Sequence, residues 1–183
     1  MKLIFGLGNP EPWYERTRHN CGAMVVEELA RGERVRLEAA DFPALVAMLS
    51  AGGQEILIAR SMVHMNCSGE ALRKVVDRYG LTSEEILVVC DDFQLDLGRL
   101  RFRRQGSSGG HKGLQSIIDA LGTESFARLR IGIGLPQGDP VEFVLSPFRA
   151  SEWAAMEPCI RQAASAALQW AQQGIEVCMN RYN

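Results

Sequence analysis

Three polar sites in the chain combine residue types that could perform acid–base chemistry. Asn9 follows the first apolar run of the sequence, and His19 directly precedes a predicted helix. Asp91 and Asp92 close a later apolar run, residues 86–89. Each residue alone is more typical of a turn, a cap or core packing. Together they are typical of a general base, because a carboxylate at a strand end orients an imidazole and stabilises its protonated form.

The loop around Asn9 has a competing interpretation as a dinucleotide-binding turn. Residues 6–11 read Gly-Leu-Gly-Asn-Pro-Glu, so Glu11 replaces the third glycine of the G-x-G-x-x-G pattern. Pro10 also removes a backbone donor from the turn. The sequence therefore does not favour a nucleotide-dependent oxidoreductase. Asn9 is better interpreted as a neutral donor and acceptor beyond a strand end, where α/β folds form their clefts.

A cysteine nucleophile is a weaker hypothesis. The chain has five cysteines without a C-x-x-C pair, so neither a disulfide framework nor a zinc ribbon is expected. Cys90 lies in an apolar run and is predicted to be a buried small hydrophobe. Cys21 and Cys67 stand at predicted helix starts, in no recognised nucleophile context.

A metal centre would have to draw on the three histidines of the chain and one carboxylate: His19, His64, His111 and Asp91. No two of these histidines have the i, i+4 spacing of a helical zinc motif. We therefore predict neither a metal nor an organic cofactor.

Basic residues are concentrated in one part of a chain whose net charge is only −2. The group comprises Arg99, Arg101, Arg103, Arg104 and Lys112, with Arg128 and Arg130 further on. A solvated strand face is the usual explanation for such a run. Here the run flanks a Gly/Ser-rich stretch, residues 106–110, before a predicted helix, and backbone N–H groups at such a place can hold a phosphate. A basic track beside a neutral polar cleft suits a tRNA substrate better than a small acid.

The elements that must position these residues alternate between strands and helices. Strands are predicted over 2–7, 44–49, 54–59, 86–89, 99–103 and 128–134, the second and third as a hairpin. Helices are predicted over 20–30, 68–79, 112–121 and 151–173, with Ser68 as a cap and Gly32, Gly80, Gly122 and Gly174 as stops. The pattern predicts an α/β fold: one three-layer domain, residues 1–183, with a twisted mixed β-sheet flanked by helices.

Composition is typical of a globular protein, with 46% hydrophobic and 23% charged residues. No apolar run approaches the roughly 18 residues of a membrane helix. The N-terminal residues lack the features of a signal or transit peptide. We expect a cytoplasmic monomer without membrane contact or an obligate protein partner.

Several motifs, in order along the chain, resemble those of the bacterial peptidyl-tRNA hydrolase family. They are Gly6–Pro10 with Tyr14, Thr17–Asn20, Met65–Gly69, Val88–Asp92, Gly106–Gly113 and Arg128–Gly134. The resemblance covers nearly the whole chain. It implies a single α/β domain with a twisted mixed sheet, and it implies hydrolysis of the ester that joins a peptide to tRNA, without a cofactor.

The resemblance also implies roles for the three polar residues singled out above. His19 matches the family's catalytic base, and Asp91 matches the partner that stabilises the basic form of the histidine. Asn9 matches the residue that separates blocked from free aminoacyl groups.

Further positions match substrate contacts of the family. Asn66 resembles the asparagine that binds near the ester, and Tyr14 and His64 fall at tRNA-contact positions. Arg103 and Arg130 match a basic pair proposed to clamp a tRNA phosphate.

The chain departs from the family pattern at Glu11, in the segment before Met65 (Arg60-Ser61 and His64) and at Lys112, and the last two departures bear on substrate contacts. Glu11 replaces a glycine, His64 stands where phenylalanine is usual, and Lys112 stands where asparagine is usual. We predict that Lys112 points into the cleft and contributes to tRNA affinity more than to chemistry. The departures leave a rival hypothesis, a relative that binds tRNA but has lost turnover. His19 and Asp91 argue against it, because a pure binder needs neither.

Overall fold

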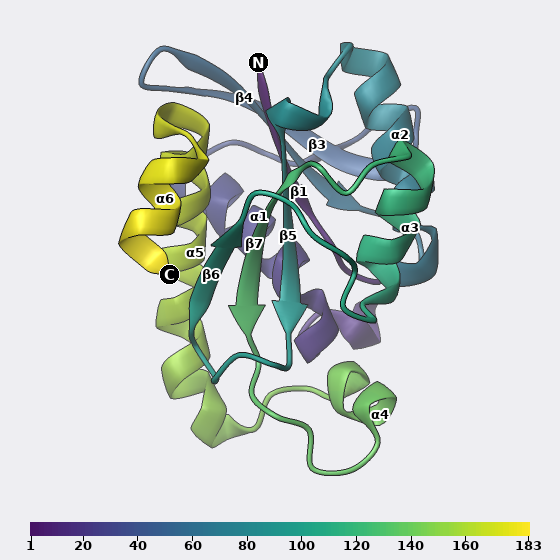
Figure 1. The fold of residues 1–183 in the computed structure, drawn as a ribbon, viewed down its shortest axis with the longest axis vertical. Helices are drawn as coiled ribbons and strands as arrows, with labels where there is room; N and C mark the ends of the chain where they lie inside the picture. The colour runs from purple at the N-terminus through teal and green to yellow at the C-terminus, as the bar shows by residue number, and fades with distance from the viewer.

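One β-sheet runs through the chain, which the computed structural model describes from residue 1 to residue 183 (Figure 1). Its strands are β1 (Lys2–Gly6), β2 (Glu38–Ala39), β3 (Ala44–Ala51), β4 (Gln54–Ser61), β5 (Ile86–Asp92), β6 (Leu100–Arg103) and β7 (Ala127–Gly132). They lie in the order β2-β3-β4-β1-β5-β7-β6. The neighbours β4, β1, β5 and β7 pair in parallel, whereas β2, β3 and β6 pair antiparallel with their neighbours. The predicted mixed sheet is confirmed.

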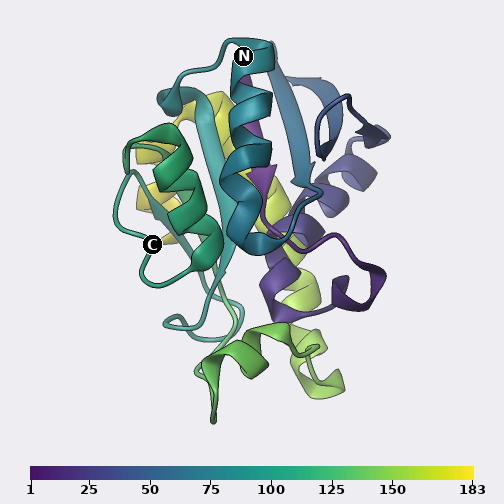
Figure 2. The ribbon, with the colours of Figure 1, turned by 90° about the vertical axis from the view of Figure 1, so that its right-hand side faces the viewer.

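Helices cover both faces of this sheet (Figures 1 and 2). The α-helices are α1 (Cys21–Gly32), α2 (Ser68–Tyr79), α3 (Lys112–Leu121), α4 (Pro140–Leu145), α5 (Ala150–Gln173) and α6 (Ile175–Tyr182). Four 3-10 turns are η1 (Pro12–Tyr14), η2 (Arg18–Asn20), η3 (Met65–Cys67) and η4 (Ser83–Glu85). One core lies between the sheet and α1, α5 and α6, and a second lies between the sheet and α2 and α3. The predicted three-layer α/β architecture is therefore confirmed. None of the helices has the length and apolar character required to cross a membrane.

Local sequence explains most of these elements. The β3–β4 hairpin turns at Gly52 and Gly53, whose φ values of 60° and 77° suit the tight turn between twisted strands. Every residue of β5 is buried, as its continuous apolar run predicts. In β6, Leu100 and Phe102 are buried while the intervening arginines are not, which is the predicted strand with one wet face.

Some boundaries differ from the prediction. Ser68 is the first residue of α2 and does not cap it; its hydroxyl donates to the carbonyl of Met65 at 2.7 Å. Gly32 lies inside the last turn of α1 instead of following it. The short elements β2, α4 and α6 and the 3-10 turns η1, η2 and η3 were not predicted.

The sheet places the polar candidates at one edge. The sheet order puts β1 next to β5, and the crossovers on either side of this pair leave a crevice at their carboxyl ends. The start of α1 packs tightly there, because a Cβ on Gly22 would collide with the carbonyl oxygen of Val89 and the backbone nitrogen of Leu7. This close approach carries His19, three positions before Gly22, to the end of β5.

Candidate active site

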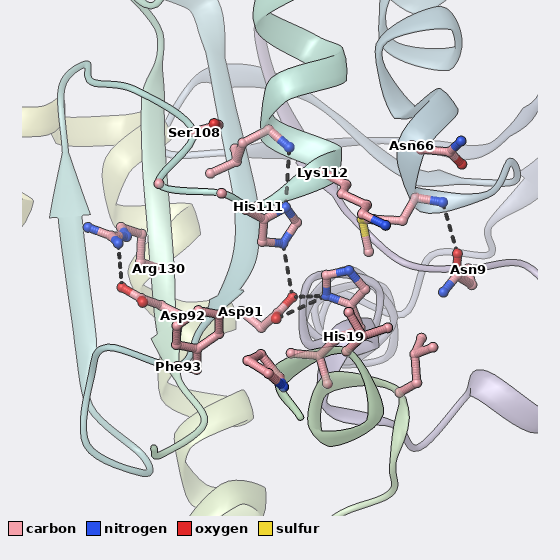
Figure 3. A pocket seen from close by; sticks show the side chains of 18 of the residues that line it. Asn9, His19, Asn66, Asp91, Asp92, Phe93, Ser108, His111, Lys112 and Arg130 are labelled. Carbon is pink, nitrogen blue, oxygen red and sulfur yellow. Dashed lines mark hydrogen bonds and ion pairs between the residues drawn. The ribbon is translucent and has the colours of Figure 1, made fainter. Parts of the chain in front are cut away.

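A cavity of about 690 Å³ opens beyond the carboxyl ends of β1 and β5 (Figure 3). Its walls come from the loop after β1, from η3, from the start of α3 and from α4. Eight of the nine residues predicted for the site line it: Asn9, Tyr14, His19, His64, Asn66, Asp91, Lys112 and Arg130. The ninth, Arg103, lies outside the lining. Residues from widely separated segments thus meet in one place.

Asp91, near the end of β5, lies between two imidazoles (Figure 3). Its Oδ1 and Oδ2 atoms lie 2.9 and 3.0 Å from Nδ1 of His19, and Oδ1 lies 3.1 Å from Nε2 of His111. Burial by itself raises the pKa of the Asp91 carboxyl. The adjacent rings of His19 and His111 outweigh burial through charge and hydrogen bonds, and they hold that pKa well below its ordinary value. Asp91 is therefore an anion that accepts hydrogen bonds from both rings.

His19 presents one ring nitrogen to Asp91 and the other to the cavity. The η2 turn holds its backbone, and its side chain is only 11% exposed. Because the Asp91 carboxylate accepts at Nδ1, the proton of a neutral His19 ring is placed on Nδ1. The lone pair then lies on Nε2, which has no hydrogen-bond partner in the protein and faces the cavity (Figure 3).

His111 is a site residue that the sequence suggests only as a possible metal ligand. It caps α3, since its Nδ1 accepts from the backbone nitrogens of Gly113 and Leu114 at 3.1 and 3.2 Å. An accepting Nδ1 carries no proton, so the proton of the neutral ring lies on Nε2 and is donated to Asp91. The position before a predicted helix was a signal for a cap, but histidine is not a usual capping residue.

Asn9 is fixed in a single orientation. The side chain of Asn20 accepts from the backbone nitrogen of Asn9 at 2.9 Å and donates to its carbonyl at 3.0 Å. The Oδ1 atom of Asn9 accepts from the backbone nitrogen of Met65 at 2.8 Å. Since the oxygen is occupied, only the NH₂ group of Asn9 is available to a ligand. The residue therefore acts as a preorganised donor.

Asn66 and Tyr14 both line the cavity. Asn66 lies in η3 and is exposed, and its side chain is free of hydrogen bonds to the rest of the fold apart from a 3.9 Å contact from the sulfur of Cys67. Tyr14 is half-buried at the end of η1. Both side chains thus present polar groups to the cavity without a competing partner.

The predicted basic pair lies on one face of the two strands at the sheet edge. Arg101 is directly opposite Arg130 in the register, so Arg103 is a diagonal neighbour of Arg130. Nη2 of Arg130 forms an ion pair with Oδ2 of Asp92 at 2.7 Å. Burial, and then the charges of Arg101 and Arg130, lower the pKa of Arg103, which shows that positive charges crowd this face.

Arg128 belongs to the same basic group, but its role is structural. It is buried and donates to the carbonyls of Ser107 and Glu124 at 2.6 and 3.3 Å. Arg128 therefore secures the Gly/Ser-rich loop and is not available to a phosphate.

The cavity contains no cysteine thiol, and the four possible metal ligands His19, His64, His111 and Asp91 do not form a single group in it. None of the five cysteines lines the cavity, and burial raises the pKa of Cys21 and Cys90. Ligand atoms of His19, Asp91 and His111 lie within 4.8 Å of one another, whereas His64 is not part of this group. Nδ1 of His19 and Nε2 of His111 both contact Asp91, so a metal bound through these nitrogens would displace both ring protons.

Comparison with known proteins identifies the family of this chain. A family model described as peptidyl-tRNA hydrolase matches residues 3–183. The chain belongs to the peptidyl-tRNA hydrolase family. Peptidyl-tRNA hydrolases of Syntrophomonas wolfei and of a Thermoanaerobacter species are each 43% identical to it over 183 residues, with both chains fully covered. The crystal structure of peptidyl-tRNA hydrolase from Acinetobacter baumannii superposes with a TM-score of 0.93 at 32% identity, covering 100% of this chain and 94% of that one.

Two departures from the peptidyl-tRNA hydrolase pattern contact each other. Nε2 of His64 lies 3.2 Å from Oε1 of Glu11, with the His64 side chain 66% exposed. His64 lines the cavity, whereas Glu11 does not. It leaves the hydrogen bonds of His19, Asp91 and Asn9 untouched.

The third departure, Lys112, is the first residue of α3. It is exposed and lines the cavity near His111 (Figure 3). A helix N-terminus disfavours a cation by roughly 0.3–1 kcal/mol, a cost that a bound phosphate would offset.

Proposed function

We propose that this chain hydrolyses the ester between a peptide and the 3′-terminal ribose of tRNA, with His19 as general base. The observation that carries the mechanism is the contact of His19 Nδ1 with both oxygens of Asp91, at 2.9 and 3.0 Å. It places the ring proton away from the cavity and the lone pair toward it. Membership of the peptidyl-tRNA hydrolase family supplies the reaction.

The proton transfers follow from this arrangement. Nε2 of His19 takes a proton from water, and the hydroxide attacks the ester carbonyl. The imidazolium that forms is stabilised by the carboxylate of Asp91. Collapse of the tetrahedral intermediate breaks the bond to the ribose oxygen, which receives the proton from His19. The products are a peptide with a free carboxyl group and tRNA with a free hydroxyl.

Two side-chain amides suit the acyl part of the substrate. The NH₂ group of Asn9 is the part of that side chain left free by Met65, so it donates to a peptide carbonyl or to the oxyanion. The amide of Asn66 is exposed on η3 and reaches the same space. An ester is more reactive than an amide, so a modest base with positioned donors suffices.

His111 keeps Asp91 in its working state. It donates a second hydrogen bond to Oδ1 of Asp91 while its other nitrogen is fixed by the start of α3. The carboxylate is thereby held ionised and unable to rotate away from His19. His111 is a positioning residue for the base.

The tRNA part of the substrate meets the cationic side of the cavity. Arg130 lines it, Arg103 lies diagonally beside Arg130, and Lys112 stands at the start of α3. Phosphates attract such groups through charge, with release of counterions. Tyr14 and His64 serve as further contacts with the tRNA end.

The cellular setting is part of the proposal. Peptidyl-tRNA is the substrate partner, and we place the protein in the cytoplasm as a monomer without an obligate protein partner. A relative that binds tRNA without turnover is the rival function. The bonded unit of His19, Asp91 and His111 favours the enzyme, because binding alone does not require it.

One assay separates these functions. Purified protein should release free tRNA from N-acetylated aminoacyl-tRNA in the presence of a chelator and without an added cofactor. It should leave the same aminoacyl-tRNA with a free amino group nearly intact. Binding without release supports the inert relative, and release that needs a metal contradicts the mechanism above.

A further inference from the structure

Arg18, next to His19 in η2, is a buried arginine that the mechanism does not use. It is 3% exposed. Nη1 donates to the carbonyls of Ser146 and Pro147 at 3.2 and 2.7 Å and to the hydroxyl of Ser146 at 2.7 Å. Nη2 forms an ion pair with Oε2 of Glu152 at 2.7 Å. The guanidinium is therefore bonded at both ends to the segment that follows α4.

Aromatic and backbone contacts add to this attachment. The guanidinium carbon of Arg18 lies 4.4 Å from the ring centre of Phe143 and 5.1 Å from that of Phe148. Thr17 and Pro147 form an isolated β-bridge. The chain from the end of α4 to the start of α5 thus surrounds one side chain of the turn that carries His19.

Helix α4 has few other anchors. It has six residues, and none of them is buried. A helix of that length is not stable by itself, so neighbouring contacts decide its position. Its apolar side chains Pro140, Val141, Val144 and Leu145 line the cavity, and α4 contacts η2, the turn that carries His19.

We propose that Arg18 is a positioning residue that holds α4 as an apolar wall for the acyl side chain of the substrate. The inference rests on the proposed function. The ester must lie near Nε2 of His19, and the cationic Lys112 and Arg130 suit the phosphate-bearing part. The uncharged wall of α4 suits the acyl part. Because Arg18 and His19 are adjacent in the chain, the contacts of Arg18, which tether α4, fix the distance between this wall and the base His19.

The test is Arg18→Lys, which keeps the charge but loses the planar fork of donors. The Michaelis constant for N-acetyl-leucyl-tRNA should rise about tenfold, as when an apolar pocket loses a fitted contact. For N-acetylglycyl-tRNA, which has no side chain to contact the wall, the rise should stay below about threefold. The kcat values and the pH profile should change little, because His19 and Asp91 keep their bond. Ser146→Ala, which removes one acceptor, should give a smaller change in the same direction.

Hydrogen exchange on the free protein supplies a readout independent of activity. Amides of residues 141–146 should exchange about tenfold faster in Arg18→Lys. The matched control is Arg161→Lys, since Arg161 forms only an exposed i, i+4 pair with Glu157 at 2.7 Å; it should change neither readout. If hydrogen exchange in this segment is unchanged in Arg18→Lys, the claim that Arg18 holds α4 is refuted. Equal changes of the Michaelis constant for both substrates would refute the role of α4 as a wall for the acyl side chain. A fall in kcat with a shifted pH profile would refute it as well. If the wild-type protein does not hydrolyse either substrate, the proposed function itself is refuted.

Discussion

Replacing Asp91 with asparagine removes the charge that the two imidazoles share while keeping the size of the side chain. The side chain of Asp91 is 2% exposed, so water does not take the place of the lost acceptor. A hydrogen bond to a charged group contributes about 1.5–3 kcal/mol. If that stabilisation is absent from the imidazolium in the transition state, kcat falls about 10- to 150-fold.

The hydrogen-bond geometry indicates that the loss of kcat should lie near the upper end of this range. Oδ1 of Asp91 serves both rings, whereas Oδ2 contacts only His19, at 3.0 Å. In Asp91→Asn the amide oxygen replaces Oδ1, and the NH₂ group then faces Nδ1 of His19. This donor favours the ring tautomer with its proton on Nε2, which has no lone pair for water. We expect kcat to fall about 100-fold.

The assay is tRNA release from saturating N-acetylated aminoacyl-tRNA over a series of pH values. Because the pKa of Asp91 is held well below its ordinary value, the carboxylate stays ionised wherever the enzyme works. The acidic limb of the wild-type profile therefore does not report protonation of Asp91. It should move to lower pH in Asp91→Asn, since the amide does not stabilise imidazolium.

Asp92→Asn is the matched control. Asp92 is the next residue, but it pairs with Arg130 rather than with His19. Its replacement should act on tRNA affinity and leave kcat within about threefold. If Asp91→Asn keeps the wild-type kcat, or if both variants lose kcat equally, the stabilising role of Asp91 is refuted.

Three further predictions address the second imidazole and the tRNA side. His111→Gln should lower kcat about tenfold, measured by turnover, because a hydrogen bond to Asp91 is lost. It should also lower the stability of the fold by about 1 kcal/mol, measured by thermal unfolding, because the cap of α3 is lost. A loss of kcat as large as that of His19→Ala would contradict a positioning role. Arg103→Ala and Arg130→Ala should each reduce the slope of log affinity against log salt by about one. Equal losses on a substrate that carries only the terminal nucleotides would exclude a remote phosphate contact. Lys112→Asn should keep kcat and weaken the salt dependence of binding, whereas a kcat raised by orders of magnitude would identify the native lysine as an impairment.

Much of the fold could be predicted because local patterns decide it. The apolar run of β5, the glycine turn between β3 and β4, and the start and end of α3 all follow from periodicity and turn residues. The short α4 and α6 could not be predicted in this way. Their few residues take their positions from tertiary contacts, such as the packing of α4 against Arg18.

The site shows the same division. Asn9, His19 and Asp91 were predictable because strand ends and the residues after them meet at one edge of a parallel sheet. The bond of His111 to Asp91 was not, since it joins residues 20 positions apart that only the packing of α3 against the sheet brings together. Likewise, the sequence does not show that Arg128 is buried and bonded to a loop while Arg103 and Arg130 are only half-buried.

The most direct test of the proposed chemistry is single-turnover hydrolysis of N-acetylated aminoacyl-tRNA by His19→Ala, alongside tRNA binding by the same variant. His19 makes no hydrogen bond to the rest of the cavity lining other than that to Asp91, so its removal should leave the tRNA contacts in place. The hydrolysis rate should fall about 10²- to 10⁴-fold, as expected for loss of a general base. The dissociation constant for tRNA should stay within about threefold of the wild-type value. A variant that hydrolyses at the wild-type rate would remove His19 from the mechanism.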